Sequence, residues 1–184
     1  MRWFWIDRFT EFVSGKYATA VKNVSLADEV TDEYAPGRPL YPSSMIIEGM
    51  AQAGGLLLDQ MHGFSGRVVL AKVIKAEFAT ESMPGDQLDF RVDIDVIQKG
   101  GAFVKGTVNR NGEMHANIDL MFAILGTDDN RFSGVELFEP ADFCRMIRLL
   151  RTFEVGVNED GIPIEVPEHM LEAEKAYLKM EWGS

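Results

Sequence analysis

Alternation of apolar and polar residues is the most regular pattern in this chain, and it predicts a β-sheet. Between residues 87 and 97 (QLDFRVDIDVI), every second residue up to Val96 is apolar. A period of two indicates a strand with one buried and one exposed face. The same alternation, or a high content of β-branched residues, predicts further strands at 6–13, 16–24, 67–78, 102–109 and 115–125. His115 begins the last of these on the polar face, so we expect it at the surface.

Residues 44–58 (SMIIEGMAQAGGLLL) follow a different pattern, because apolar residues fall on nearly every side of a helical wheel. Such a helix is buried inside the protein, and this one is too short and too polar to cross a membrane. Ser43 or Ser44, directly after Pro42, suits the N-cap position. The sheet needs a cover for its apolar face and the helix needs burial. The sequence therefore predicts an α+β fold in which an antiparallel sheet wraps around one central helix.

Two polar side chains interrupt this apolar helix. Glu48 and Gln52 are four residues apart and therefore lie on one stripe. A carboxylate among apolar neighbours is unfavourable unless hydrogen bonds satisfy it, and it can also be held there for chemistry. Glu48 lies too far along the helix to belong to a capping box. The structural alternatives are a salt bridge to an Arg or Lys and a wet edge of the helix.

The pattern of apolar and polar residues changes after residue 125. Residues 126–134 are polar and typical of a loop, whereas residues 141–153 have the apolar spacing of an amphipathic helix. Pro167 opens a second helix with a broad apolar face. Two such helices are too little for a core of their own. We therefore expect residues 1–125 to form the main domain, and residues 126–184 to form a C-terminal helical extension that packs on this domain or on a partner subunit.

Composition narrows the functional classes. The 184 residues carry a net charge of −11 without a long basic run, which argues against nucleic-acid binding. The three histidines and one cysteine are widely separated and form no metal-ligand pattern, and no phosphate loop or dinucleotide motif is present. Cys144 has no disulfide partner, so we expect a small core residue in a reducing compartment. The N-terminus lacks the apolar run of an export signal, and the sequence predicts a cytoplasmic protein without membrane association.

Three stretches of the chain resemble the 3-hydroxyacyl-(acyl carrier protein) dehydratases of fatty acid synthesis, the FabA/FabZ type, whose fold is the hotdog. They read GRPLYPSSMIIEGMAQAGGLL, LAKVIKAEFATESMPGDQL and GGAFVKGTVNRNGEMHANIDLMFAIL, and the similarity covers residues 6–125. The resemblance implies that the family's catalytic acid falls on Glu48 and its supporting glutamine on Gln52. It also implies that the reaction is the elimination of water from an acyl thioester, which needs no cofactor or metal.

The chain departs from the family pattern at two points. Tyr34 stands where the family has the histidine that removes the proton next to the thioester carbonyl. An unperturbed phenol is protonated near neutral pH and is a poor base, whereas a neutral imidazole is a good one. Ser43-Ser44 replaces the usual Gly-Val at the helix start, where in the family a backbone N–H polarises the thioester carbonyl. The expected catalytic residues are thus Glu48, Tyr34 and Gln52, and the expected substrate contacts are Ser43, Ser44 and Met45.

Three activities are compatible with these residues. The first is a dehydratase, in which Glu48 protonates the departing hydroxyl while Tyr34 holds the substrate or relays a proton. Asp32 or Glu33, close to Tyr34 in the sequence, are alternative bases. The second is a non-catalytic acyl-thioester-binding protein, a pseudoenzyme. The third is a thioesterase in which Glu48 activates water.

The resemblance also implies partners. Because the family's site is shared between subunits, we expect a homodimer or a higher homo-oligomer. An acyl carrier protein is acidic, so docking it requires a local basic patch on a chain whose overall negative charge opposes strong electrostatic steering. The candidates for this patch are Arg38, Arg67, Lys72, Lys75 and Lys105.

Overall fold

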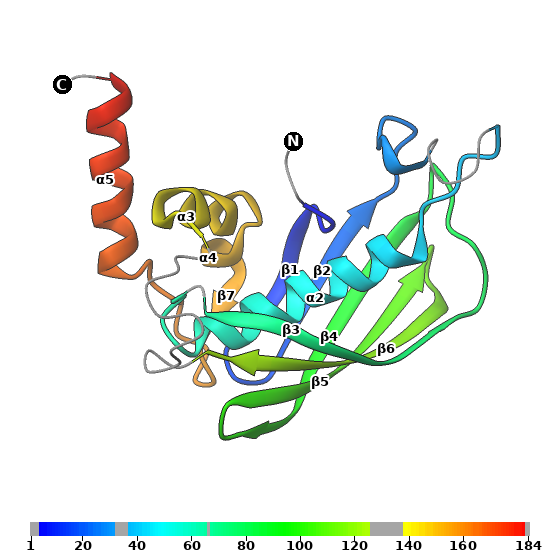
Figure 1. The fold of residues 1–184 in the computed structure, drawn as a ribbon, viewed down its shortest axis with the longest axis horizontal. Coiled ribbons are helices and arrows are strands. Elements are labelled where there is room, and N and C mark those ends of the chain that lie inside the picture. Colours follow the sequence, from blue (N-terminus) through cyan, green and yellow to red (C-terminus); the bar gives the residue numbers. More distant parts are fainter. Residues whose placement is uncertain (1–3, 32–36, 66, 126–137, 183–184) are drawn as a thin grey trace.

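The fold is a curved sheet that wraps around one long helix (Figure 1). It was determined as a computed structural model that describes residues 4–31, 37–65, 67–125 and 138–182. The strands are β1 (Arg8–Val13), β2 (Tyr17–Asn23), β3 (Val68–Phe78), β4 (Gln87–Gln98), β5 (Gly101–Arg110), β6 (Glu113–Ile124) and β7 (Gly156–Val157). Their order in the sheet is β3-β6-β5-β4-β2-β1-β7, and every described pair is antiparallel except β1 with β7. The predicted α+β architecture is confirmed.

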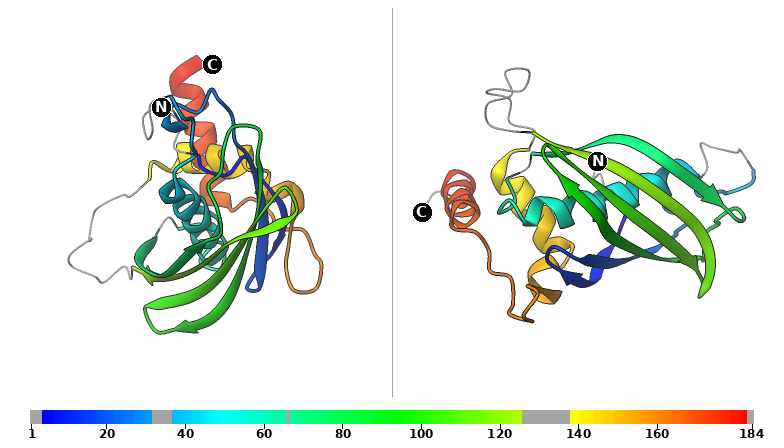
Figure 2. Two further views of the ribbon diagram at one scale, coloured as in Figure 1. Left: turned by 90° about the vertical axis from the view of Figure 1, so that its right-hand side faces the viewer. Right: turned by 90° about the horizontal axis from the view of Figure 1, so that it is seen from below.

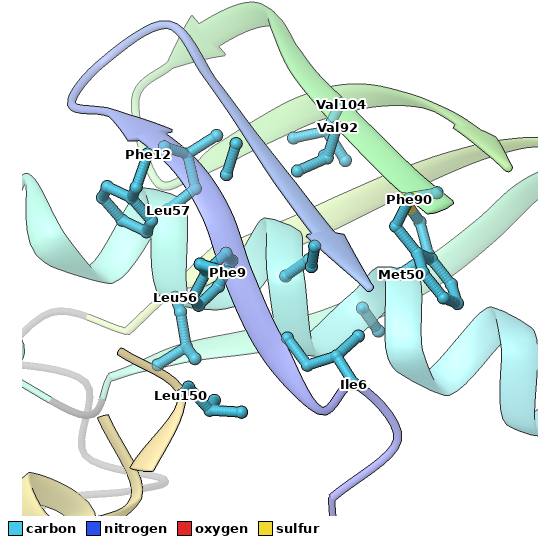
Figure 3. Packing of buried hydrophobic residues seen from close by; sticks show 14 of the residues in the cluster. Ile6, Phe9, Phe12, Met50, Leu56, Leu57, Phe90, Val92, Val104 and Leu150 are labelled. Atoms are coloured by element: carbon cyan, nitrogen blue, oxygen red, sulfur yellow. The ribbon is translucent and has the colours of Figure 1, made fainter. Parts of the chain in front are cut away.

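Helix α2 (Ser43–Gln60) lies inside the curve of the sheet, as the apolar pattern predicted (Figures 1 and 2). Its buried side chains meet the inward faces of the strands, and Figure 3 shows Leu57 packed beside Phe12 of β1. Two glycines let the backbones come close. A side chain at Gly106 of β5 would collide with Met50 of α2, and one at Gly49 would lie 2.9 Å from the carbonyl oxygen of Trp5.

The start of α2 differs from the sequence expectation. Pro42, with an extended backbone, occupies the N-cap position, and no side chain caps the first turn. The N–H of Met45 is bonded instead to the carbonyl oxygen of Pro42 at 2.9 Å. The prediction of Ser43 or Ser44 as the cap was therefore wrong, because the helix begins early enough to place both serines within its first turn, where they are exposed.

Two β-bulges break the alternation that predicted which residues face the core. In β6, Ala116 pairs with Val108 and Met114 pairs with Asn109, so His115 is an extra residue between them. A bulge turns such a residue out of the regular pleat, and His115 is only 2% exposed. Its predicted surface position was wrong. A second bulge after Ile94 in β4 leaves Val96 48% exposed, although the alternation predicted burial.

The C-terminal segment meets the sheet through α4 (Thr152–Val155) and β7, which lie against β1, while α3 (Pro140–Leu149) packs on α4. The expected single helix at 141–153 is divided, because the backbone N–H of Phe9 in β1 is bonded to the carbonyl oxygen of Leu150 at 2.8 Å, an acceptor that a continuous helix would use itself. Arg151 then adopts a left-handed conformation with φ of 61°. Helix α5 (Glu168–Trp182) follows and is tied to α3 by the ion pair of Arg148 with Glu174, at 2.6 and 2.8 Å.

Candidate active site

A cavity of about 380 Å³ runs along α2, within the range of about 300–1,000 Å³ that is usual for small-molecule sites. On α2 it follows a stripe of residues at helical spacing, from Glu48 through Gln52 and Gly55 to Asp59. Eleven residues of helix correspond to about 16 Å. The other lining residues are all apolar: Ala51, Leu56, Val68, Val69, Leu70, Phe122, Phe138, Phe143, Met146 and Leu150.

Glu48 is half-buried and belongs to the wall of this cavity. Ala51 and Leu56, which flank the stripe, are buried. Glu48 thus lies beside an apolar hollow large enough for a ligand, and such sites are where enzymes hold an acid or a base.

Gln52, one turn after Glu48, is oriented by the N-terminal segment of the chain. Its Oε1 accepts a hydrogen bond from the backbone N–H of Trp5 at 2.9 Å. Since this hydrogen bond orients the amide oxygen of Gln52 toward Trp5, the NH₂ group of Gln52 is the part that can donate a hydrogen bond to an acceptor such as a carboxylate. The contact joins residues 47 positions apart, and sequence reasoning did not predict it.

The N-terminus of α2 lies one turn before Glu48. Ser44 and Glu48 are four residues apart, which is about 6 Å along the axis. The first turn carries no acidic residue and no side-chain cap, so its backbone N–H groups present the positive end of the helix dipole without local neutralisation. Ser43 and Ser44 are exposed and Met45 is half-buried. These three predicted substrate contacts flank the cavity along the helix and are not among the residues that line it.

The proposed base cannot be placed in the same way. Tyr34 and the alternatives Asp32 and Glu33 lie outside the residues that the structure describes. Residues 38–41, which follow them in the chain, are bonded to the segment between β3 and β4. Arg38 forms an ion pair with Glu81, and the N–H of Tyr41 is bonded to the carbonyl oxygen of Ser82 at 2.8 Å.

His115 contacts the segment that holds residues 38–41, a role that sequence reasoning did not predict. Its Nε2 lies 2.9 Å from Oγ of Ser82, and its ring packs edge-on against Phe78. Burial lowers the pKa of His115, and the nearby Arg110 lowers it further. The helix start is therefore connected through Tyr41 and Ser82 to a buried imidazole.

Comparison with known proteins identifies the family. The FabA-like domain model matches residues 3–119, more than half of the chain. The chain belongs to the FabA-like family. A relative in this family, the 3-hydroxyacyl-[acyl-carrier-protein] dehydratase FabZ of Symbiobacterium thermophilum, is 36% identical over 121 residues, which are 65% of this chain and 85% of the relative.

Solved structures of similar shape carry the hotdog fold. The dehydratase heterocomplex ApeI:P from Xenorhabdus doucetiae superposes with a TM-score of 0.56 at 17% identity, over 66% of this chain and 82% of that one. A hot-dog-like protein from Thermanaerovibrio acidaminovorans gives a TM-score of 0.52 at 21% identity, over 64% and 86%. The predicted resemblance and the predicted hotdog fold of this FabA-like chain are confirmed.

Most basic residues predicted to dock a carrier protein already have acidic neighbours. Lys75 lies 2.8 Å from Glu77, Lys105 lies 2.9 Å from Asp95, and Arg38 is paired with Glu81 as described. Lys72 is exposed on β3. These pairs reduce the local positive charge, so the predicted basic patch is weaker than its residue count suggests.

Within the described part of the chain, no cluster of His, Cys, Asp and Glu is arranged to hold a metal ion. None of the described helices is long and apolar enough to cross a membrane. The division of the chain at residue 125 stays a prediction, because the structure does not describe residues 126–137.

Proposed function

We propose that this protein eliminates water from 3-hydroxyacyl thioesters presented by an acyl carrier protein. The reaction breaks a C–H bond next to the thioester carbonyl and the neighbouring C–OH bond, forms a carbon–carbon double bond and releases water. The proposal rests on the position of Glu48, a half-buried carboxyl group at the wall of an apolar cavity. Membership of the FabA-like family, whose relatives here are named as dehydratases of this class, supports it.

The predicted catalytic residues and the start of α2 have separate roles in this proposal. Glu48 donates its proton to the departing hydroxyl, and Gln52, held by Trp5, orients the carboxyl group. The uncapped first turn at Ser43 and Ser44 directs its N–H groups at the thioester oxygen, where negative charge develops in the transition state. Tyr34 holds the substrate or relays the proton taken from carbon. A positioned acid or base contributes about 10²–10⁴-fold, so the absence of the family's histidine predicts a slow enzyme.

Turnover of 3-hydroxyacyl thioesters tests this proposal directly. Glu48→Gln should lower kcat by at least about 10²-fold and leave the affinity for the acyl thioester largely unchanged, because Gln preserves the size of the side chain. Glu172→Gln is the matched control, since Glu172 is an exposed glutamate in another helix. Full activity of Glu48→Gln would refute the role of Glu48. Loss of activity in Tyr34→Phe would assign a catalytic role to Tyr34.

A second function is favoured by one observation, the tyrosine at position 34. A chain without the family's base can bind acyl thioesters without converting them. In that case the wild type binds but forms no product, and Tyr34→His yields an active enzyme. Release of a free fatty acid instead of an unsaturated thioester would identify hydrolysis, the third activity predicted from the sequence.

The proposal includes a homodimer, because the family's site is shared between subunits. Support comes from β3, the end strand of the sheet in the described structure. It exposes Leu70, Val73 and Ile74, each at least 38% accessible, and an apolar edge of this kind is a template for pairing with another strand. Sedimentation equilibrium should give twice the mass of the chain, and a monomer at all concentrations would exclude the dimer.

A further inference from the structure

The C-terminal extension builds part of the cavity wall. Phe138, Phe143, Met146 and Leu150 line the cavity together with the α2 stripe and β3. Helix α3 lies toward the C-terminal end of α2 in Figure 1 and in the right-hand view of Figure 2, and Figure 3 shows Leu150 beside Leu56. The cavity therefore runs from Glu48 toward a wall that comes from outside the part of the chain matched by the family model.

This wall is held in place by contacts between its own residues and by contacts on its other sides. The rings of Phe138 and Phe143 stack with centroids 4.9 Å apart. At the far end of α3, the carbonyl oxygen of Leu150 accepts the hydrogen bond from β1, and Arg148 is paired with α5. Phe143, Met146 and Leu150 are three and four residues apart and thus share one face of the segment. Phe143 and Leu150 are buried, whereas Met146 between them is half-buried.

We infer that Met146 on α3 limits the length of the acyl chain that the cavity accepts, so that the extension determines substrate specificity. The inference rests on the proposed function, because it takes an acyl thioester as the ligand. If the thioester lies near Glu48 and the helix start, the mostly apolar remainder of the cavity is the space for the alkyl chain. The chain then extends along Gln52 and Gly55 until it meets the wall.

Chain-length dependence is the signature of this arrangement. Each methylene group moved from water into the cavity should raise the affinity about fourfold. This gain in affinity should stop where the acyl chain reaches Met146. A longer acyl chain must either displace a wall that is held by β1 and α5 or leave its end in water. A plot of affinity against chain length should therefore show a break.

The position of the break can be measured with a series of straight-chain saturated acyl-CoA thioesters in isothermal titration calorimetry. Met146→Ala should move the break to longer chains and Met146→Trp to shorter ones, while Met146→Leu should leave it in place because it conserves volume. Met180→Ala is the matched control, since Met180 is 86% exposed on α5. Thermal unfolding of each variant verifies that it is folded.

Binding and turnover separate this inference from the proposed function. A break that moves with Met146 in a protein without dehydratase activity supports the inference and refutes the catalytic proposal. Dehydratase activity with a break that stays in place in folded Met146→Ala and Met146→Trp refutes the inference alone. An affinity that does not depend on chain length would also overturn the inference, because the cavity would then take no alkyl chain.

Discussion

Gly55 offers a test of the cavity that does not depend on any assumed reaction. It is half-buried in the middle of α2 and lines the cavity. A Cβ atom placed there would lie 3.5 Å from the ring of Phe122, which is an ordinary van der Waals contact, and the structure gives it no closer neighbour. Gly55→Ala should therefore fit without strain and point its methyl group into the open space.

The expected effect is a more stable protein. Glycine inside a helix is less favourable than alanine by about 0.8–1.0 kcal/mol, and no clash at position 55 opposes this gain. For a chain of this size, a change of about 1 kcal/mol shifts Tm by about 2–4 °C. The same methyl group narrows the cavity, so binding of the longest acyl chains should weaken while the fold becomes more stable.

Two other glycines of α2 serve as controls, because they differ in what a methyl group would meet. At Gly54 the nearest ring atoms of Phe122 lie at 3.2 and 3.3 Å, so repacking should offset most of the gain. At Gly49 the carbonyl oxygen of Trp5 lies at 2.9 Å, and it belongs to the backbone. Overpacking costs about 1–3 kcal/mol, which leaves Gly49→Ala destabilised by up to about 2 kcal/mol after the helical gain.

Urea titration of the three variants and the wild type measures these differences. The free energy of unfolding should fall in the order Gly55→Ala, Gly54→Ala, Gly49→Ala, with Gly55→Ala above the wild type, Gly54→Ala close to it and Gly49→Ala below it. A destabilised Gly55→Ala would show that the space beside residue 55 is filled in the folded protein. A Gly49→Ala variant as stable as Gly55→Ala would contradict the close approach of the N-terminal segment to α2.

Two further predictions concern buried titratable groups. Because burial lowers the pKa of His115 in the folded state, the unfolded chain binds the proton first as the pH falls. The free energy of unfolding should therefore decline below a pH of about 6.5, the usual value for histidine. His115→Gln should remove this part of the decline, whereas His169→Gln, at an exposed position, should not. Urea titration of both variants at pH values of about 7.5 and 5.5 measures the decline. Equal declines in the two variants would refute the assignment to His115. Cys144 is fully buried, and burial is the main cause that raises its pKa to about 11. Iodoacetamide should therefore modify it only after unfolding, and rapid stoichiometric alkylation of the native protein would show that the thiol is accessible.

The regular elements could be predicted because local patterns determine them. The helix expected at residues 44–58 is Ser43–Gln60, and the strand expected at 87–97 is Gln87–Gln98. The errors arose where distant hydrogen bonds override the local pattern. The bulge at His115 depends on the register with β5, and the break before Arg151 depends on β1. Neither partner can be identified from the residues around the error.

The candidate site was predictable only in part, for the same reason. Spacing alone places Glu48 and Gln52 on one stripe, and the structure has both at the cavity. The wall at Met146 is formed by a segment almost a hundred positions later in the chain, and an amphipathic pattern does not say which surface its apolar face will cover. Tyr34 stays a prediction from the family resemblance.

The two ends of the sheet have opposite consequences for assembly. At one end, β7 is only two residues long, pairs with Phe12 and Val13 of β1, and is bridged on Val157 by Pro163. A strand so short, next to a proline, is a poor template for another chain. A second copy that pairs along β3 uses the open edge of both molecules in a symmetric contact. Association then stops at the dimer, and continued edge-to-edge assembly into a filament is disfavoured.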